Sequence, residues 1–498
     1  MEYLPTDLYT AALTRQLDQL AIHDFNIPGY DLMSRAGEAI FRLLQDQYSL
    51  SKRILVCCGA GNNAGDGYVV ARLAQQAGFR VRVISMVDTT ELKGDARTAY
   101  EHWKSLGRQL SKCEPESFEG VDVIIDALLG TGLQRPVEGR WQACIELING
   151  SARPVIAVDI PSGLNADTGS VMGIAVKAAM TLSFIGLKRG LFTHQAADYC
   201  GELFFDGLGV PRAVYNRVAT NAYRLDYENL SQQLKPRRAN THKGSYGHVL
   251  VIGGDYGMAG AVRLAAEAAL RAGAGLVTVV TRAEHVAAIV TGRPELMVIA
   301  SEHGAISSQL LEHASSILIG PGLGTDKWGQ ALLSRVLESR CPKVLDADAL
   351  NLLGQQEAPG QDWILTPHPG EAARLLGETT PVIQQSRFTA AEMLQALYGG
   401  VLVLKGAGTL VQTSHRVSVC PYGNPGLATA GSGDVLGGII AALLAQGFDL
   451  ATAAELGVVV HARAGDLAAS HGERGLIASD LFDSIRHLIN PDTRPLAQ

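Results

Sequence analysis

Short apolar runs alternate with helical patterns along most of the chain. In the first half the runs lie at 53–58, 81–87, 121–130 and 154–163. In the second half they lie at 248–252, 276–280, 316–320, 343–348, 363–370 and 400–406. Continuous apolar strands separated by helices are typical of parallel sheets that are covered on both faces. The pattern therefore predicts an α/β protein with two three-layer α/β/α domains.

The two halves begin in the same way. Residues 53–78 and 248–275 each contain an apolar run, a glycine-rich turn and a helical pattern that glycine closes. Such a unit is a strand, a turn and a helix. Residues 216–244 between the halves are polar, contain Pro236 and show no sustained period. We therefore place the domain boundary at about residue 220, which gives domains 1–220 and 221–498.

Composition narrows the class of protein. The 498 residues are 47% hydrophobic and 18% charged and include 55 glycines, as in a compact enzyme rather than a scaffold or a disordered chain. The net charge of −7 gives no attraction to nucleic acid or to an anionic membrane. Seven cysteines without regular spacing indicate buried thiols in a reducing compartment.

Neither a signal peptide nor a membrane span is predicted. Residues 1–22 carry acids among apolar residues, and their spacing predicts an amphipathic helix. The longest apolar stretch, 436–445, is shorter than the roughly 20 residues that cross a bilayer. We therefore expect a cytoplasmic protein with neither a membrane nor a nucleic-acid partner.

Near the carboxyl end, GNPGLATAGSGD places Gly431, Ser432, Gly433 and Asp434 directly before a helical run of small residues. Glycines let backbone N–H groups approach an anion, and the helix start adds its positive dipole end. A carboxylate there would repel phosphate unless it handles a proton or a metal. Asp434 is therefore the first catalytic candidate. The alternative is that the glycines only shape a turn and that Asp434 caps the helix.

Four other polar motifs favour the catalytic interpretation. They are GPGLG (320–324), LDADAL (345–350), TPHPGE (366–371) and LKGAGTLV (404–411). Each lies at or just after an apolar run. An open α/β sheet builds its ligand site at the carboxyl ends of its strands, so these motifs are expected to converge.

A second polar cluster is expected in the first domain, again at or just after strand ends. Its members are Asn62, Asn63, Asp66, Asp126, Asp159 and Ser162. Three carboxylates in one crevice require a cation or a polyhydroxyl ligand, because unpaired buried carboxylates are costly. Oxygen ligands suit a hard ion such as potassium, magnesium or calcium.

The turn after the first strand also fits a dinucleotide fingerprint. Gly59, Gly61 and Ala64 satisfy G-x-G-x-x-A. The acid expected about 20 residues further on is missing, and the nearest strand-end candidate is the later Asp88. Asn62 and Asn63 also make the turn too polar for plain helix packing. These features disfavour a conventional Rossmann dehydrogenase domain.

Taken together, the motifs resemble those of the bifunctional NAD(P)H-hydrate repair enzymes. GNNAGDG, VIIDALLGTG and VDIPSGLNADTG match the family's epimerase domain. The dehydratase domain is matched by HKGSYGHVLVIGG, GMAGA, GAGLVTV, GPGLG, TPHPGE, LKGAGTL and GNPGLATAGSGD. The matches span nearly the whole chain in the family's order, which makes them far more specific than a single glycine loop.

The resemblance implies repair of NADH or NADPH whose nicotinamide ring has been hydrated (NADHX and NADPHX). The Rossmann-like first domain would be an isomerase that interconverts the R and S hydrates. The ribokinase-like second domain would be a lyase that dehydrates the S hydrate with a nucleotide. Bacterial members usually use ADP, giving AMP and phosphate, and eukaryotic members use ATP. The fused arrangement fits the bacterial type.

The resemblance also implies the site residues of the epimerase domain. Positions matching the family's hydrate-binding residues are Asn62, Asn63, Ala64, Gly65, Asp66, Gly130, Thr131, Gly132, Leu133, Gln134, Arg135, Pro136 and Asp159. Positions matching the potassium ligands are Asn63, Asp126 and Ser162. Our hypothesis is that Asp159 is the general acid/base.

In the dehydratase domain the matching positions form two groups. Those that line the hydrate are Ala261, Gly322, His368 and Asp434. Those of the nucleotide site are Lys405, Gly406, Ala407, Gly408, Thr409 and Gly433, with Gly431 in the anion hole. Ser432 stands where the family often has Thr, and both side chains carry a hydroxyl.

The mechanistic hypothesis for this domain is phosphorylation of the hydrate. Asp434 would deprotonate the substrate hydroxyl, which accepts the terminal phosphoryl group of the nucleotide, and phosphate then leaves. Magnesium would bridge the phosphates. Glu371 is a candidate ligand, although it also suits the helix start after Pro369. His368 has a structural alternative as a cap or a core histidine.

Two other functions remain open at this stage. A ribokinase-like kinase of a small alcohol would share the fold and the GxGD loop, and a stable phosphorylated product would identify it. The second alternative makes the first domain a binding or scaffolding module, but Asn63, Asp126, Asp159 and Ser162 favour a working site. The sequence does not decide ADP against ATP or NADHX against NADPHX. We expect a homo-oligomer.

Overall fold

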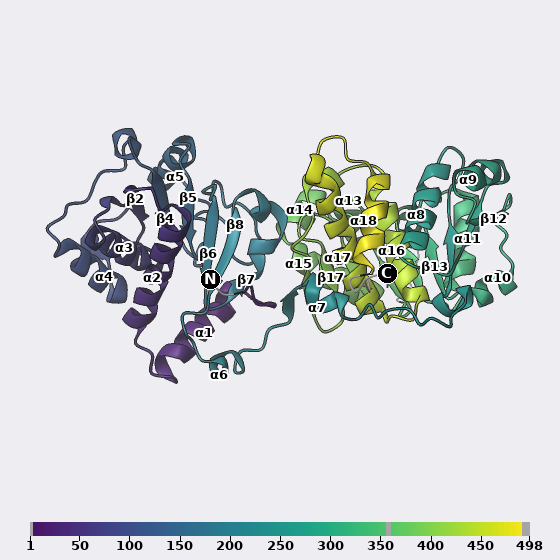
Figure 1. The fold of residues 1–498 in the computed structure, drawn as a ribbon, viewed down its shortest axis with the longest axis horizontal. Coiled ribbons are helices and arrows are strands. Elements are labelled where there is room, and N and C mark those ends of the chain that lie inside the picture. The colour runs from purple at the N-terminus through teal and green to yellow at the C-terminus, as the bar shows by residue number, and fades with distance from the viewer. Residues whose placement is uncertain (1–2, 355–359, 491–498) are drawn as a thin grey trace, which may run out of the picture. The chain divides into compact units, whose positions relative to one another are not determined.

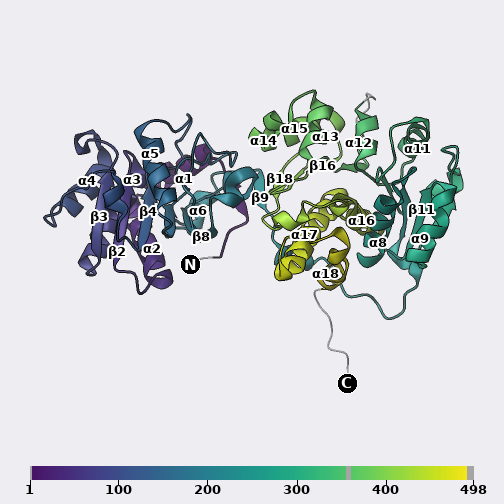
Figure 2. The same ribbon diagram turned by 90° about the horizontal axis from the view of Figure 1, so that it is seen from above.

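The computed structural model describes residues 3–354 and 360–490. It divides into two compact units, Met1–Tyr223 and Arg224–Gln498. Figures 1 and 2 show each unit as strands accompanied by helices. The two-domain α/β fold that the sequence predicts is thus confirmed.

The first unit is built on a six-stranded parallel sheet in the order β3-β2-β4-β5-β6-β8. Its strands are β2 (Arg53–Cys58), β3 (Arg80–Ser85), β4 (Val123–Ala127), β5 (Val155–Val158), β6 (Met180–Phe184) and β8 (Glu202–Asp206). Its helices are α1 (Ala11–His23), α2 (Gly29–Gln47), α3 (Asn62–Gln76), α4 (Gly94–Lys104), α5 (Arg140–Gly150) and α6 (Arg212–Tyr215).

Alternate residues of β2 show why its run is apolar throughout. Val56 packs into a cluster with side chains of α2 and α3. Its neighbours Leu55 and Cys57 pack into a second cluster with residues of α5. Successive strand residues point to opposite faces, so helices cover both faces of this sheet.

The amino-terminal segment differs from the expected continuous helix. Asp7–Tyr9 forms β1, which pairs with β7 (Leu187–Lys188) and with β9 (Ala222–Arg224). α1 begins only after Thr10, whose hydroxyl accepts from the N–H of Leu13 at 3.2 Å. Residues 7–9 therefore form a strand because they pair with segments far away in the sequence, although their local spacing favours a helix. Met1 and Glu2 lie outside the described residues.

The sheet of the second unit runs in the order β12-β11-β10-β13-β14-β15-β16-β17-β18. It is parallel from β12 to β16, but β16–β17 and β17–β18 pair antiparallel. The strands are β10 (His248–Ile252), β11 (Leu276–Thr281), β12 (Met297–Ala300), β13 (Ser316–Ile319), β14 (Lys343–Leu345), β15 (Trp363–Leu365), β16 (Val401–Leu404), β17 (Leu410–Gln412) and β18 (Val417–Val419). The antiparallel edge was not predicted, because three-residue strands leave no clear period.

Four helices of this unit pack closely through small residues. Together α8, α16, α17 and α18 form a core with residues of the central strands (Figure 2). A Cβ added at Gly438 of α16 would lie 2.1 Å from the Ala265 carbonyl oxygen of α8, so glycine permits this close approach. The helices are α7 (Tyr227–Ser231), α8 (Ala259–Arg271), α9 (Val286–Gly292), α10 (Ser308–His313), α11 (Lys327–Leu337), α12 (Asp348–Leu353), α13 (Pro369–Leu376), α14 (Thr380–Gln385), α15 (Arg387–Tyr398), α16 (Ser432–Ala445), α17 (Leu450–Ala468) and α18 (Leu481–Leu488).

No helix within the described ranges combines the length and the apolar character needed to cross a bilayer.

Candidate active sites

A cavity of about 850 Å³ opens at the carboxyl ends of β2, β4 and β5 in the first unit. Ligand sites of parallel sheets lie at this edge. Predicted residues that line the cavity are Asn62, Asn63, Asp66, Asp159 and every residue from Gly130 to Pro136. Ala64 and Gly65 are buried and do not line it. A Cβ added at Gly65 would lie 2.5 Å from the Met33 side chain, so Gly65 permits the packing of α3 against α2.

Asp159 follows β5 and has a strained backbone, with φ of 67°. One carboxylate oxygen, Oδ1, accepts from the N–H of Phe184 at 3.1 Å and from the Ser183 hydroxyl at 3.3 Å. The same oxygen forms an ion pair with Nζ of Lys188. The carboxylate is thus fixed from three directions at the cavity wall.

Lys188 is a functional candidate that the sequence interpretation missed. Its side chain is only 1% exposed, yet the residue lines the cavity. Besides the ion pair with Asp159, its ammonium donates to the Ser183 hydroxyl at 3.1 Å and to the Phe184 carbonyl at 3.0 Å. A single lysine in the run LSFIGLKRG gave no motif to detect.

Two more carboxylates share this cavity. Burial raises the pKa of Asp18 to about 6, with Lys188 lowering and Asp159 raising it. The pKa of Asp66 lies well above its usual range, again chiefly because of burial. Lys188 therefore acts on three carboxylates at once, and Asp18 was also missed because it lies on α1, far from any motif.

Asp126 and Ser162 lie behind the cavity wall, and Asn63 lines the cavity itself, beside the segment that follows β4. The Asp126 carboxylate is fully buried and accepts from the N–H of Ser162 at 2.8 Å and from its hydroxyl at 2.6 Å. A Cβ added at Gly130 would lie 3.4 Å from that of Asn63. Among the described residues, the buried side-chain nitrogen of Asn63 finds no hydrogen-bond partner.

These three side chains carry oxygen atoms of the kind that bind a hard cation. Burial raises the pKa of Asp126 to about 6, and a cation beside it would restore the ionised form. The donors are carboxylate, hydroxyl and amide oxygens, as hard ions prefer. Among the described residues, no group of three His, Cys, Asp or Glu side chains is arranged to bind a metal ion.

In the second unit the predicted residues again follow strand ends. Gly431 precedes α16 with φ of 87°, the left-handed conformation that glycine adopts without strain. Asp434 lies in the first turn of α16. Burial, together with Asp346 and Asp348, raises the pKa of Asp434 to about 7, although Lys405 lowers it. Such a carboxylate can exchange a proton near neutral pH.

Lys405, at the end of β16, links these groups. Its ammonium donates to Oδ1 of Asp346 at 2.7 Å and lies 3.8 Å from Oε2 of Glu371. Burial lowers the pKa of Lys405, but Asp346, Glu371 and Asp434 outweigh it, and the pKa is raised. A Cβ added at Gly433 would lie 3.3 Å from the ammonium, so Lys405 and the glycine loop face one space.

His368 caps α13, which is the structural role that the sequence left open for it. Its Nδ1 accepts from the N–H of Gly370 at 2.9 Å, and Oε2 of Glu371 accepts from the His368 N–H at 2.7 Å. Burial lowers the pKa of His368 although Glu371 raises it, and the side chain remains 51% exposed. Capping therefore orients the imidazole without hiding it.

The loop from Lys405 to Thr409 rests on Arg387, which the sequence interpretation did not identify. This fully buried guanidinium donates to the carbonyls of Leu404, Lys405 and Gly408 at 3.2–3.3 Å. A Cβ added at Gly406, where φ is 130°, would lie 2.8 Å from it. Arg387 thus sets the shape of the loop from α15.

Ala261, in the first turn of α8, lies against Gly322. A Cβ added at Gly322 would lie 3.4 Å from that of Ala261. Further along α8, Leu264 would be 2.5 Å from a Cβ at Gly431. The first two turns of α8 therefore connect the Gly322 loop with the glycine loop before α16.

Comparison with known proteins finds a separate match within each unit. A family profile described as NAD(P)H-hydrate dehydratase matches residues 249–487, and one described as YjeF-related protein N-terminus matches residues 29–190. A bifunctional NAD(P)H-hydrate repair enzyme of Coxiella burnetii is 50% identical and covers 98% of this chain and 100% of its own length. The corresponding enzyme of Vibrio cholerae is 46% identical over 98% of this chain and 99% of its own.

The second unit also resembles solved structures. One is an ADP/ATP-dependent NAD(P)H-hydrate dehydratase from Bacillus subtilis, co-crystallised with ATP and Mg²⁺, with a TM-score of 0.51 and 31% identity. The match covers 55% of the present chain and 99% of the Bacillus subtilis chain. A ribokinase-like protein from Enterococcus faecalis gives a TM-score of 0.51 at 29% identity and covers 55% of this chain and 97% of that one.

Proposed function

The chain belongs to the bifunctional NAD(P)H-hydrate repair enzymes, and from that premise we propose how its two units divide the repair. The unit up to about residue 220 interconverts the R and S hydrates of NADH and NADPH. The unit that follows dehydrates the S hydrate with a nucleotide, ADP being converted into AMP and phosphate. The observation that carries this division is that each unit holds its own set of converging carboxylates and a lysine among them: Asp18, Asp66 and Asp159 with Lys188 in the first unit, and Asp346, Glu371 and Asp434 with Lys405 in the second.

In the epimerase unit, Asp159 would hold and return the proton that moves as the hydroxyl-bearing carbon loses its configuration. Its carboxylate already lies on the cavity wall and is held by Lys188. Asn63, Asp126 and Ser162 would hold a potassium ion, which supplies positive charge near the substrate. Residues Gly130 to Pro136 would form the wall against which the hydrate lies.

In the dehydratase unit, Asp434 would take the proton of the substrate hydroxyl as the terminal phosphoryl group of ADP is transferred to that oxygen. Phosphate then leaves, because it is a far better leaving group than hydroxide. The backbone around Gly431 and Gly433 would bind the phosphoryl oxygens, with Lys405 beside them. Magnesium would neutralise phosphate charge when bound, and Glu371 and Asp346 are carboxylates within reach of Lys405.

We further propose a cytoplasmic homo-oligomer that acts on small molecules and binds no nucleic acid. The net charge of −7 supports the last point.

The defining experiment uses the full-length protein with mixed R and S NADH hydrate, magnesium, potassium and ADP. Absorbance of the reduced nicotinamide ring is expected to recover completely, with one AMP formed per NADH. Recovery of the S form alone would make the first unit a binding module. A stable phosphorylated product without recovery would identify a small-molecule kinase instead.

Substitution of Asp159 by asparagine tests the first unit. D159N keeps the shape of the side chain but cannot take a proton, so epimerisation should fall by roughly 10²- to 10⁴-fold while hydrate binding persists. The rate is measured by following conversion of pure R hydrate to S hydrate. Dehydration of S hydrate by the same variant is the internal control, and full epimerase activity would refute the assignment.

A further inference from the structure

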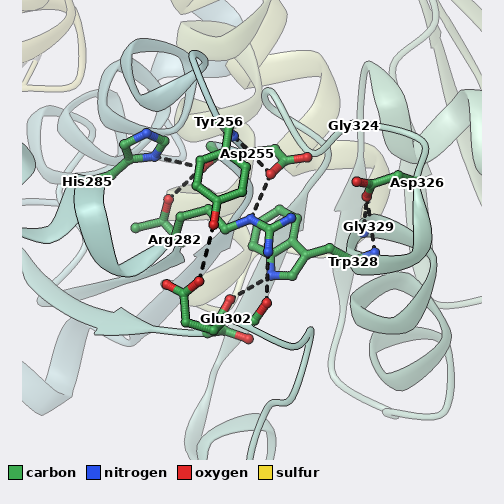
Figure 3. A network of polar contacts seen from close by, with 12 residues as sticks. Asp255, Tyr256, Arg282, His285, Glu302, Gly324, Asp326, Trp328 and Gly329 are labelled. Atoms are coloured by element: carbon green, nitrogen blue, oxygen red, sulfur yellow. Dashed lines mark hydrogen bonds and ion pairs between the residues drawn. The ribbon is translucent and has the colours of Figure 1, made fainter.

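Tyr256 forms an exposed aromatic surface in the second unit, outside the predicted site residues. It belongs to the loop between β10 and α8, and 55% of its surface is exposed. The guanidinium of Arg282 lies beneath its ring, 4.5 Å from the centroid, and 4.3 Å from a ring centroid of Trp328 on the other side. Figure 3 shows these residues in one network.

Polar contacts fix both ends of Tyr256. Its N–H donates to Oδ1 of Asp255 at 2.8 Å, and its hydroxyl donates to Oε2 of Glu302 at 3.3 Å. The same two acids also position the surroundings, because Asp255 accepts from Nε of Arg282 at 2.7 Å and Glu302 accepts from the Ala283 N–H at 2.6 Å. These contacts, which Figure 3 shows, hold the side chain in place, while 55% of its surface remains exposed.

The position of Tyr256 relates it to the hydrate rather than to ADP. β10 and β13 are neighbours in the sheet, and the loop after β13 contains Gly322. A Cβ added at Gly324 in that loop would lie 2.8 Å from Asp255. By contrast, β13, β14 and β15 separate β10 from β16, which precedes Lys405. Four strand spacings amount to roughly 19 Å.

The hydrate has two ring systems at its ends, and only one of them is flat enough to stack on Tyr256. Hydration adds a hydroxyl to the nicotinamide ring and removes its planarity at that carbon, whereas the adenine at the other end of the dinucleotide stays flat and aromatic. Flat aromatic rings stack on tyrosine faces. The surface beside the ring is open, because nothing in the described structure lies within 4 Å of a Cβ added at Gly257 or Gly260.

We propose that the exposed face of Tyr256 binds the adenine of the NAD(P)H hydrate while the hydrated ring lies at Asp434. This inference rests on the dehydratase function proposed above. Arg282 and Trp328 support the ring from below. Stacking of the adenine on Tyr256 would contribute to the binding of the hydrate at a point remote from the reacting carbon.

The test compares two substrates in wild type, Y256A and Y256F. One substrate is S NADH hydrate, and the other is the hydrate of reduced nicotinamide mononucleotide, which lacks the AMP half of the dinucleotide. Y256A is expected to raise KM for NADH hydrate roughly tenfold, as lost stacking on a base predicts. We expect kcat and KM for ADP to change by less than about twofold, and Y256F to match wild type.

With the truncated hydrate, Y256A and wild type should have equal kcat/KM. Equal losses on both substrates would show a structural disturbance and overturn the proposal, as would an unchanged KM for NADH hydrate. A higher KM for ADP would assign Tyr256 to the nucleotide instead. If wild type dehydrated neither substrate, the dehydratase function itself would fail, which is a distinct outcome.

Discussion

Dehydration of S NADH hydrate is expected to fall about a thousandfold when Asp434 is replaced by asparagine, within the range measured for loss of a general base. D434N retains the shape of the side chain and one acceptor oxygen but cannot accept the hydroxyl proton. The fall should appear in kcat and in kcat/KM alike, because the interaction operates in the transition state. AMP release and recovery of the nicotinamide absorbance measure the two products.

The same carboxylate predicts how dehydration depends on pH. Burial, Asp346 and Asp348 raise the pKa of Asp434 to about 7, and a base works only when ionised. In the wild type, kcat/KM should therefore rise with pH through about 7 and fall tenfold for each unit below it. The small residual rate of D434N should not fall in this way below pH 7.

Epimerisation supplies the control for D434N, because it occurs in the other unit of the same chain. A D434N protein that interconverts R and S hydrate at the wild-type rate is correctly folded there, and thermal unfolding tests the second unit. Dehydration within tenfold of wild type would mean that another group takes the proton, and Asp346 would then be examined next.

The fold was largely predictable because its signal is repeated. Each buried parallel strand carries a continuous apolar run, and the helices between them keep their period. The short elements were missed for a physical reason. β1 has three residues and forms only because β7 and β9 lie on either side of it, and such long-range pairing leaves no local pattern.

The candidate sites were predictable where motifs follow strand ends. Asp434, Lys405 and Gly433 do face one space, as the strand-end argument implies. Lys188, Asp18 and Arg387 were not found. Each is a single charged residue that reaches the site from an element of its own, so only the tertiary structure reveals its role.

Lys188 is the residue outside the sequence motifs for which a large effect on epimerisation is predicted. Its ammonium is buried and pairs with Asp159, and it also lowers the pKa of Asp18 and of Asp66. K188M keeps the length of the side chain and removes the charge. Three carboxylates would then share the cavity without their cation, and the pKa of Asp18 should rise above about 6.

Epimerisation by K188M should therefore fall at least about a hundredfold, because Asp159 loses the contact that fixes it against Ser183 and Phe184. Carboxyl NMR of Asp18 provides a readout that a purely structural change would not shift upward in this way. Dehydration of S hydrate should be unchanged.

The double variant K188M/D159N separates the lost charge from lost folding. Removing one partner of a buried ion pair leaves an uncompensated charge and destabilises the fold by several kcal/mol, whereas removing both is often close to neutral. The double variant should therefore regain much of the thermal stability that K188M loses, yet remain inactive as an epimerase. If K188M epimerises within threefold of wild type, roughly 0.7 kcal/mol by the usual conversion, Asp159 is positioned by its backbone and by Phe184, and the lysine serves stability alone.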